Sequence, residues 1–224
     1  MSEKKRLAAE KAVELVQDGM KVGLGTGSTA YFAIEAIGRL VKDGYKILAV
    51  PTSLASEKQA RELGIPLATL EEAGTLDITI DGADEVDGNL DLIKGMGGAL
   101  LREKIVAYST RVQVIVVDDS KIVSKLGTKF PLPVEVVPFA HARTKTYLEE
   151  LGCRAELRGG GTPFITDNGN HIYHLHFERG IKDPYELQNK LKEIPGVVET
   201  GLFLNMAKKV IVASDPGIWV MERV

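Results

Sequence analysis

Residues 21–43 read KVGLGTGSTAYFAIEAIGRLVKD, and this stretch decides the fold. The apolar run Lys21 to Leu24 predicts a strand, and the helical spacing from Ala30 to Asp43 predicts a helix. A glycine-rich turn, residues 23–29, joins the two. Free backbone N–H groups and the positive helix end at such a turn bind anions. We therefore expect a phosphate cradle in a parallel α/β sheet.

The alternation of strand and helix continues on both sides of this stretch, which predicts a doubly wound sheet. Gly19, Gly44 and Gly64 stand where a left-handed residue commonly ends a helix. The predicted helices cover roughly residues 3–18, 30–43, 54–63 and 99–108. The predicted strands cover residues 21–24, 45–50, 76–80 and 112–117, and a last strand at 210–213 returns to this sheet.

A different order of elements begins near Lys125 to Thr128, where Pro131 and Pro133 break the pattern. The order is βαββαβ, which is the ferredoxin-like split βαβ unit. Its expected elements are a strand 134–137, a helix 138–151, a strand 154–157, a hairpin strand around 164–177 turning at 167–170, a helix 184–192 and a strand 197–200. We predict an α/β protein with a doubly wound, mostly parallel, Rossmann-like sheet and a second, smaller ferredoxin-like α+β domain. The predicted domains are residues 1–127 plus 202–224, which carry catalysis, and residues 128–201.

Composition narrows the possible partners and the compartment. A chain of 224 residues with 44% hydrophobic and 26% charged residues is an ordinary globular protein. The net charge of -3 gives no bulk positive field for nucleic acid or anionic lipid, so neither is expected as a partner. The single Cys153 excludes an internal disulfide and a Cys-x-x-Cys pair. A charged N-terminus and the lack of a long apolar run predict a cytoplasmic protein without a membrane segment.

The glycine-rich turn fits a phosphate better than a dinucleotide. The third glycine comes one residue too early for Gly-x-Gly-x-x-Gly, and the next strand ends in Val50-Pro51-Thr52 rather than in an acid. No lysine follows the last glycine, so it is not a Walker loop. The hydroxyls of Thr26, Ser28 and Thr29 add donors around Gly27.

Two carboxylates follow the strand 76–80 in the sequence Asp81-Gly82-Ala83-Asp84. The carboxyl edge of an open α/β sheet is where ligands bind. An Asp-Gly turn capped by its own side chains is the alternative. A metal loop with Asp87, Asn89 and Asp91 is disfavoured, because Val86 stands where an oxygen ligand is required.

A second glycine-rich turn, Lys94-Gly95-Met96-Gly97-Gly98, runs into the helix 99–108. Lys94 can meet a phosphate or a developing oxyanion. Glu103 lies one turn into the helix, although an exposed charged face is the alternative for Arg102-Glu103-Lys104. Lys121 follows a buried strand and can reach the same edge, although a solvated loop lysine is the alternative.

His174 and His176 share one face of a predicted strand, which raises the possibility of a zinc site. The sequence places no third ligand near them, and His141 stands isolated. We expect no metal.

Taken together, these motifs resemble the type A ribose-5-phosphate isomerase family. The matching stretches, in order, are Gly25 to Thr29, Asp81 to Glu85, Lys94-Gly95, Arg102 to Lys104, Lys121, Gly127 to Val137, Thr166 to Asn170 and Ile194 to Phe203. The resemblance spans nearly the whole chain. Met96 departs from the family's run of glycines.

The resemblance implies an aldose-ketose isomerase that interconverts D-ribose 5-phosphate and D-ribulose 5-phosphate through an enediolate, without cofactor, in the pentose phosphate pathway. It implies a homodimer or a larger assembly and a sugar phosphate as the only small-molecule partner. Glu103 is similar to the family's base, and Lys94 would stabilise the enediolate. Asp81 and Asp84 would bind the hydroxyls and open the ring, and which of the two opens the ring is left open. The implied substrate-binding residues are Thr26, Gly27, Ser28, Thr29, Asp81, Gly82, Ala83, Asp84, Lys94, Gly95, Met96, Gly97 and Lys121.

Two other classes of protein remain as alternatives. A coenzyme A transferase would use a glutamate as a covalent nucleophile. A sugar-phosphate sensor would keep the phosphate cradle without chemistry, and it would need a partner domain for which no segment is left over.

Overall fold

The computed structural model describes residues 2–223, which form two compact units. The first unit contains the residues up to Ala83, Arg102–Lys121 and the residues from Met206 on. The second contains Asp84–Leu101 and Ile122–Asn205. Among the described residues, no helix is long and apolar enough to cross a membrane.

The first unit is built on a six-stranded sheet in the order β13-β12-β6-β3-β1-β2. All neighbours are parallel except β13, which pairs antiparallel with β12. Chain order reverses between β1 and β3, so this pair marks the point at which open α/β sheets bind ligands. The strands are β1 (Lys21–Leu24), β2 (Leu48–Pro51), β3 (Leu76–Asp81), β6 (Thr110–Asp118), β12 (Lys209–Ser214) and β13 (Gly217–Glu222).

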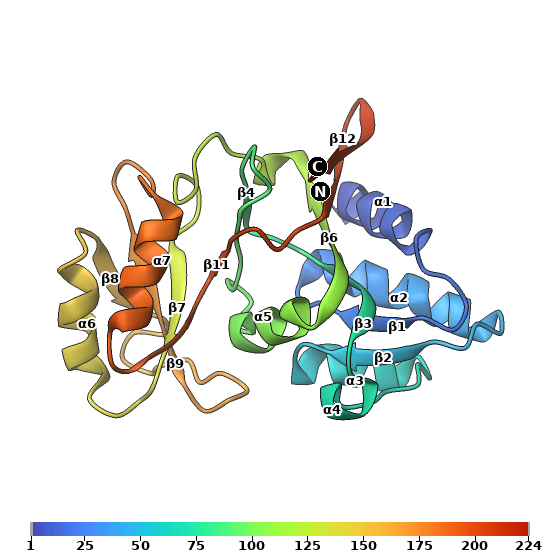
Figure 1. The fold of residues 1–224 in the computed structure, drawn as a ribbon, viewed down its shortest axis with the longest axis horizontal. Helices are drawn as coiled ribbons and strands as arrows, with labels where there is room; N and C mark the ends of the chain where they lie inside the picture. Colours follow the sequence, from blue (N-terminus) through green and yellow to red (C-terminus); the bar gives the residue numbers. More distant parts are fainter. Residues whose placement is uncertain (1, 224) are drawn as a thin grey trace. The chain divides into compact units, whose positions relative to one another are not determined.

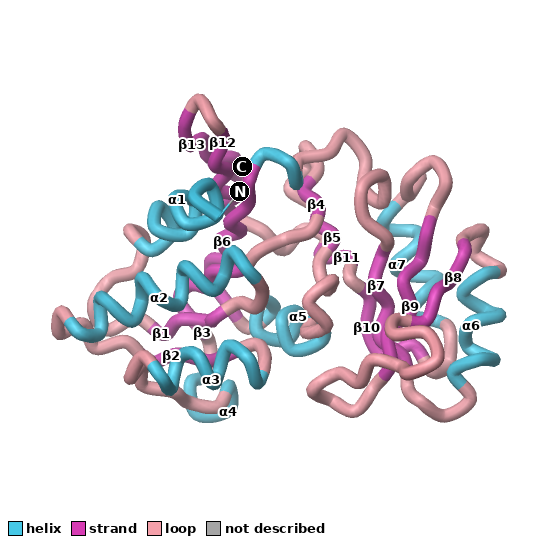
Figure 2. Tube along the Cα trace, turned by 180° about the vertical axis from the view of Figure 1, so that it is seen from behind, coloured by secondary structure: helices cyan, strands magenta, loops and turns pink. Residues whose placement is uncertain are grey.

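Helices cover both faces of this sheet (Figures 1 and 2). On one face, α1 and α2 bury a stripe of small and branched residues, among them Ala8, Ala12 and Ile37, against Val22, Val114 and other strand residues. On the other face, Val106 of α5 packs with Val50 and Leu76. The helices are α1 (Ser2–Val13), α2 (Ser28–Lys42), α3 (Leu54–Glu62), α4 (Leu70–Ala73) and α5 (Leu100–Tyr108), of which Arg102 onward belongs to this unit.

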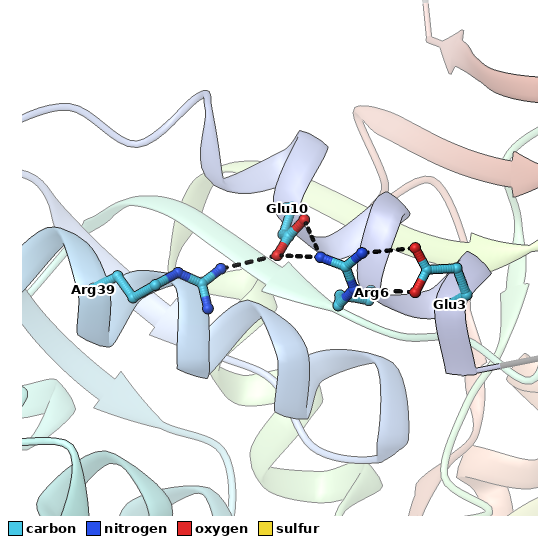
Figure 3. A network of polar contacts seen from close by, with 4 residues as sticks. All are labelled: Glu3, Arg6, Glu10 and Arg39. Carbon is cyan, nitrogen blue, oxygen red and sulfur yellow. Dashed lines mark hydrogen bonds and ion pairs between the residues drawn. The ribbon is translucent and has the colours of Figure 1, made fainter.

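A chain of charged residues links α1 to α2 (Figure 3). Arg6 donates to Glu3 at 2.6 Å and to Glu10 at 3.1 Å, and Arg39 of α2 donates to Glu10 at 3.0 Å. Arg6 lowers the pKa of Glu3 through this hydrogen bond. Exposed pairs of this kind add little stability singly.

The second unit is a four-stranded antiparallel sheet in the order β10-β7-β9-β8 with α6 and α7 on one face. Leu148 of α6 and Leu187 and Leu191 of α7 pack on Val134 and Tyr173 of the sheet. This strand order is that of the ferredoxin-like fold, so the predicted fold class is confirmed. The elements are β7 (Leu132–Val136), α6 (His141–Glu149), β8 (Arg154–Leu157), β9 (His171–His176), α7 (Pro184–Glu193) and β10 (Val197–Thr200).

The second unit also holds a small sheet in the order β11-β5-β4. Its strands are β4 (Glu85–Val86), β5 (Leu92–Ile93) and β11 (Leu202–Phe203). Buried Glu85 accepts hydrogen bonds from the N–H groups of Gly127, Lys129 and Phe130. These bonds tie residues 84–101 to the second unit, whereas the sequence placed them in the first domain. The predicted domain boundaries themselves stay a prediction.

Several predicted elements differ from those observed. The first helix ends at Val13 rather than near 18, because Leu15 and Val16 turn back to bond the carbonyls of Ala12 and Val13. The helix predicted from 138 begins at His141. The sequence missed α4, β4, β5, β11, β13 and the 3-10 turn η1 (Asp119–Lys121).

The expected hairpin strand over 164–177 is wrong in its first half. Only His171–His176 forms a strand. Glu135 accepts hydrogen bonds from Thr166 at 2.9 Å, Asn168 at 3.3 Å and Asn170 at 2.9 Å, and these hold the preceding segment as a loop.

Candidate active site

Asp81 joins two of the predicted motifs. Its Oδ1 accepts hydrogen bonds from the N–H groups of Thr26 at 3.0 Å and Gly82 at 2.8 Å. A Cβ at Gly25 would lie 2.3 Å from that oxygen and 2.6 Å from the Asp81 Cα, so only glycine permits the approach. The carboxylate is fully buried. The turn after β1 and the end of β3 therefore form one structure at the switch point of the sheet.

The glycine turn presents Gly27 and Ser28 to solvent. Gly27 has a φ of 109° as the N-cap residue of α2, a conformation that favours glycine. The Thr26 hydroxyl is bonded to the hydroxyls of Thr52 and Ser53, both at 2.8 Å, so it braces the turn. Thr29 lies against Gly82, with its Cβ 3.9 Å from the position that a Cβ at Gly82 would take.

Lys5 is a candidate that the sequence did not single out. Its Nζ donates to the Ser28 hydroxyl at 2.8 Å, at the start of α2. Both residues line a cavity of about 730 Å³ with Gly25, Thr26 and Gly27. Lys4 instead pairs with Asp119 at 3.1 Å and Asp215 at 3.0 Å, and these hydrogen bonds raise its pKa. The sequence offers consecutive lysines in an exposed helix and no signal that selects one.

Glu103 lies in the first turn of α5 and is only 3% exposed, which rules out a solvated face. The end of this helix meets the amino end of β3, because Ser109 O accepts from Leu76 N. Val106, one turn before that end, packs on Gly23, where a Cβ would lie 2.9 Å from Val106 Cγ1. The first turn of the helix therefore lies toward the carboxyl edge of the sheet, the edge that holds Asp81. A helix N-terminus also favours a negatively charged carboxylate.

Lys121 closes the turn η1 after β6, at this same carboxyl edge. Buried Asp118 shapes the turn, since its Oδ1 accepts hydrogen bonds from both N–H and hydroxyl of Ser120. The first unit thus gathers residues 25–29, Asp81, Glu103 and Lys121 at one edge.

Gly82 and Ala83 follow Asp81 in the first unit, and the second unit holds Asp84 and the turn Lys94–Gly97. Asp84 N donates to Ile93 O at 2.8 Å, and Asp84 Oδ2 accepts from Met96 N at 3.0 Å. Lys94 is 2% exposed, and its Nζ lies 5.3 Å from the centre of the Phe203 ring. Two distant sequence motifs, Asp84 and Lys94–Gly97, are therefore neighbours.

Positive φ angles in this turn fall on Gly95, at 107°, and Gly98, at 88°. Met96 has an ordinary negative φ, as its side chain requires. Gly97 has no positive φ, and the bond from Gly98 N to Gly95 O places the reversal of the chain at Gly98.

Among residues 2–223, no group of three or more His, Cys, Asp or Glu side chains is arranged to hold a metal ion. Asp87 Oδ1 accepts from the N–H groups of Asn89 and Asp91, so this segment is a side-chain-capped turn. His141, expected to be isolated, lies with its ring 4.9 Å from that of His171 and bonds the Tyr173 hydroxyl at 2.8 Å.

Comparison with known proteins identifies the family of this chain. Residues 48–217 match the family model described as ribose 5-phosphate isomerase A (phosphoriboisomerase A). The chain belongs to the ribose-5-phosphate isomerase A family. Membership makes it an aldose-ketose isomerase of sugar phosphate metabolism rather than a coenzyme A transferase or a sensor.

The relatives cover the isomerase almost end to end. Ribose-5-phosphate isomerase A of Bacillus mycoides is 52% identical over 96% of this chain and 97% of its own. The solved ribose 5-phosphate isomerase of Plasmodium falciparum is 40% identical and superposes with a TM-score of 0.97 over 100% of this chain and 99% of its own. A D-ribose-5-phosphate isomerase solved in complex with phospho-erythronic acid is 42% identical, with a TM-score of 0.95 over 99% of this chain and 98% of its own.

Proposed function

We propose that this isomerase interconverts D-ribose 5-phosphate and D-ribulose 5-phosphate through an enediolate, with Glu103 as the base. The observation that carries the proposal is the burial of the Glu103 carboxylate at the ligand-binding edge of the sheet. The reaction takes a proton from C2 of the open-chain aldose and returns one to C1. A single carboxylate positioned over both carbons can make both transfers.

Charge develops on the oxygens of C1 and C2 when the proton leaves. We assign Lys94 to stabilise it, because a cation in a water-poor site acts more strongly on developing charge than one in bulk water. The solved relative binds phospho-erythronic acid. The two carboxylate oxygens of that molecule resemble the two oxygens of the enediolate. This analogue supports an enediolate path.

Asp81 and Asp84 are assigned to the sugar hydroxyls and to ring opening. Each uses one carboxylate oxygen to accept backbone N–H groups, which fixes the orientation of the carboxylate. A carboxylate oxygen can accept a hydrogen bond from a hydroxyl group. Gly82, Ala83, Gly95, Met96 and Gly97 belong to the proposed substrate-binding set with them.

The phosphate is assigned to the glycine turn and its cations. Gly27, Ser28 and Thr29 offer donors at the N-terminus of α2, and Thr26 shapes the turn through its bonds to Asp81 and Ser53. Lys5 and Lys121 supply positive charge. We expect no cofactor or metal in the reaction.

A coupled assay of ribulose 5-phosphate formation tests this proposal. Purified enzyme should convert ribose 5-phosphate after dialysis against EDTA, and free ribose should have a kcat/KM at least about a hundredfold lower. Equal kcat/KM values for ribose and ribose 5-phosphate would show that the glycine turn is not a phosphate site. Activity that is lost on dialysis and returns with a divalent metal would overturn metal independence.

We also propose that the enzyme works as a homodimer. Among the described residues, the outer edge of β13 pairs with no strand, and Ile218, Trp219 and Val220 on it are 39%, 41% and 43% exposed. An edge strand with apolar side chains is a ready template for a second strand, and a two-fold axis lets it pair with its own copy. Sedimentation velocity checks the assembly. Because Trp219 is the only tryptophan, its emission should shift to longer wavelength on dilution, and a monomer with constant emission would contradict the proposal.

We propose a cytoplasmic location. The single cysteine is a free thiol, which suits a reducing compartment. Fractionation of the source cells should place the activity in the cytosol, and recovery with an organelle or envelope fraction would contradict this assignment.

A further inference from the structure

Arg158 lies against the turn that carries Lys94, although it is distant in sequence and matches no motif discussed above. Its guanidinium stacks on Phe164, with the central carbon 3.9 Å from the ring centre. A Cβ at Gly98 would lie 2.6 Å from Phe164 Cζ and 2.9 Å from Arg158 Nη1. The stacked pair therefore touches the backbone of the turn directly, and only glycine at 98 leaves room for it.

The backbone around Arg158 is fixed on both sides. Arg158 N donates to Ile172 O of β9 at 2.9 Å, and Phe164 N donates to Arg158 O at 2.9 Å. The segment between them is closed by Thr162 N to Gly159 O, and a Cβ at Gly159 would lie 2.3 Å from Thr162 O. These bonds fix the backbone from which the Arg158 side chain extends to Phe164.

Arg158 and Asp84 both contact the turn 94–98, Arg158 at Gly98 and Asp84 at Met96. Burial lowers the pKa of Arg158, and the negative charge of Asp84 opposes that shift. Asp84 in turn accepts from Met96 N at 3.0 Å. Arg158 Nη1 is buried and, in the part of the chain that the structure describes, has no hydrogen-bond partner. A partly desolvated guanidinium of this kind acts more strongly on a nearby carboxylate than an exposed one.

We propose that Arg158 is a positioning residue for the isomerisation, which holds Asp84 as an oriented carboxylate and braces the Lys94–Gly98 turn through the Phe164 stack. This inference rests on the proposed function, because it assigns Arg158 a role in that reaction. Arginine suits the task because its planar group can stack on a ring and remain charged.

The test is a double-mutant cycle in kcat/KM for ribose 5-phosphate, with Arg158→Met, Asp84→Asn and the double variant. Arg158→Met should lower kcat/KM about tenfold or more, and the double variant should be about as active as Asp84→Asn alone, because the residues act as a unit. Arg154→Met is the matched control: this exposed arginine of β8 pairs with Glu156 at 2.7 Å, and its loss should change kcat/KM less than about twofold.

Two further readouts separate positioning from general stability. Guanidinium ion at tens of millimolar should restore part of the kcat of Arg158→Ala and none in Arg154→Met. Arg158→Lys keeps the charge without the planar group, and it should fold even if Arg158→Met does not. Its kcat/KM should lie between those of wild type and Arg158→Ala.

An Arg158→Met enzyme within about twofold of wild type, or effects of Arg158→Met and Asp84→Asn that multiply in the double variant, would overturn the inference. Absence of isomerase activity in the wild-type enzyme would instead overturn the proposed function. The two failures are therefore distinguishable.

Discussion

The backbone N–H of Thr26 donates a 3.0 Å hydrogen bond to Oδ1 of Asp81, across 55 residues of sequence. The bond joins the end of β1 to the end of β3, where chain order in the sheet reverses. It exists because Gly25 has no side chain to separate the two strand ends. The glycine turn therefore positions a carboxylate as well as an anion site.

Replacing Gly25 by Ala should damage both stability and catalysis. The added Cβ would lie 2.3 Å from Asp81 Oδ1, and overpacking of this kind lowers the free energy of unfolding by about 1–3 kcal/mol. We expect a lower melting temperature and a kcat/KM reduced at least about tenfold. Gly88→Ala is the control, since nothing lies within 4 Å of its Cβ position. Equal activity and melting of the two variants would disprove the role of Gly25.

Lys5→Met should weaken phosphate binding, because Lys5 meets Ser28 at the start of α2. We expect KM for ribose 5-phosphate and the inhibition constant of inorganic phosphate to rise together by about tenfold, or 1.4 kcal/mol. Lys11→Met, on the same helix but paired with Glu14, should change neither constant. An unchanged inhibition constant in Lys5→Met would exclude this lysine from the phosphate site.

Glu85→Gln should destabilise the second unit, because the carboxylate accepts three backbone N–H groups. Loss of charge and of one acceptor should lower the free energy of unfolding by about 2 kcal/mol. Urea unfolding measures this change, with Glu186→Gln on the exposed face of α7 as control. A midpoint equal to that of the control would show that these bonds contribute little.

His174 should make stability fall as pH drops below about 6.5. Burial first, and then the charges of Arg158 and His176, lower its pKa in the folded chain below 6.5. The unfolded chain then binds the proton more readily than the folded chain. The contribution of His174 to the free energy of unfolding is therefore fully present above about pH 6.5, and it is lost as the pH falls from there through the folded pKa. Urea midpoints at pH 7.5 and 5.5 should differ less in His174→Gln than in wild type. The same difference in both proteins would rule out this contribution.

Much of the fold follows from local pattern. The predicted strands 21–24, 154–157 and 197–200 match the structure at both ends, because glycines or turns delimit these short segments. Periodicity does not report tertiary bonds, however. Bonds from Thr166 and Asn170 to Glu135 hold the segment before His171 as a loop, so the expected strand at 164–166 does not form. Glu85 draws residues 84–101 into the second unit.

The candidate site likewise contains residues that the sequence identifies and residues that only the fold brings into place. Asp81, Asp84, Lys94 and Glu103 stand in motifs that the sequence displays, and the resemblance to the family implies the roles that we propose for them. Lys5 and Arg158 carry no such signal, because each is one of many exposed or loop cations until the fold places it. Lys5 becomes visible through its 2.8 Å contact with Ser28, and Arg158 through its stack on Phe164.

The central claim is that Glu103 moves the proton between C2 and C1. It is tested by kcat for ribulose 5-phosphate formation by Glu103→Gln, with substrate affinity measured by calorimetry on the same sample and with Glu186→Gln, exposed on α7, as control. Glutamine keeps the shape but cannot accept the proton. Turnover should therefore fall by about 10² to 10⁴, while affinity and melting temperature stay near those of wild type. A Glu103→Gln enzyme that turns over within about threefold of the control would contradict the claim.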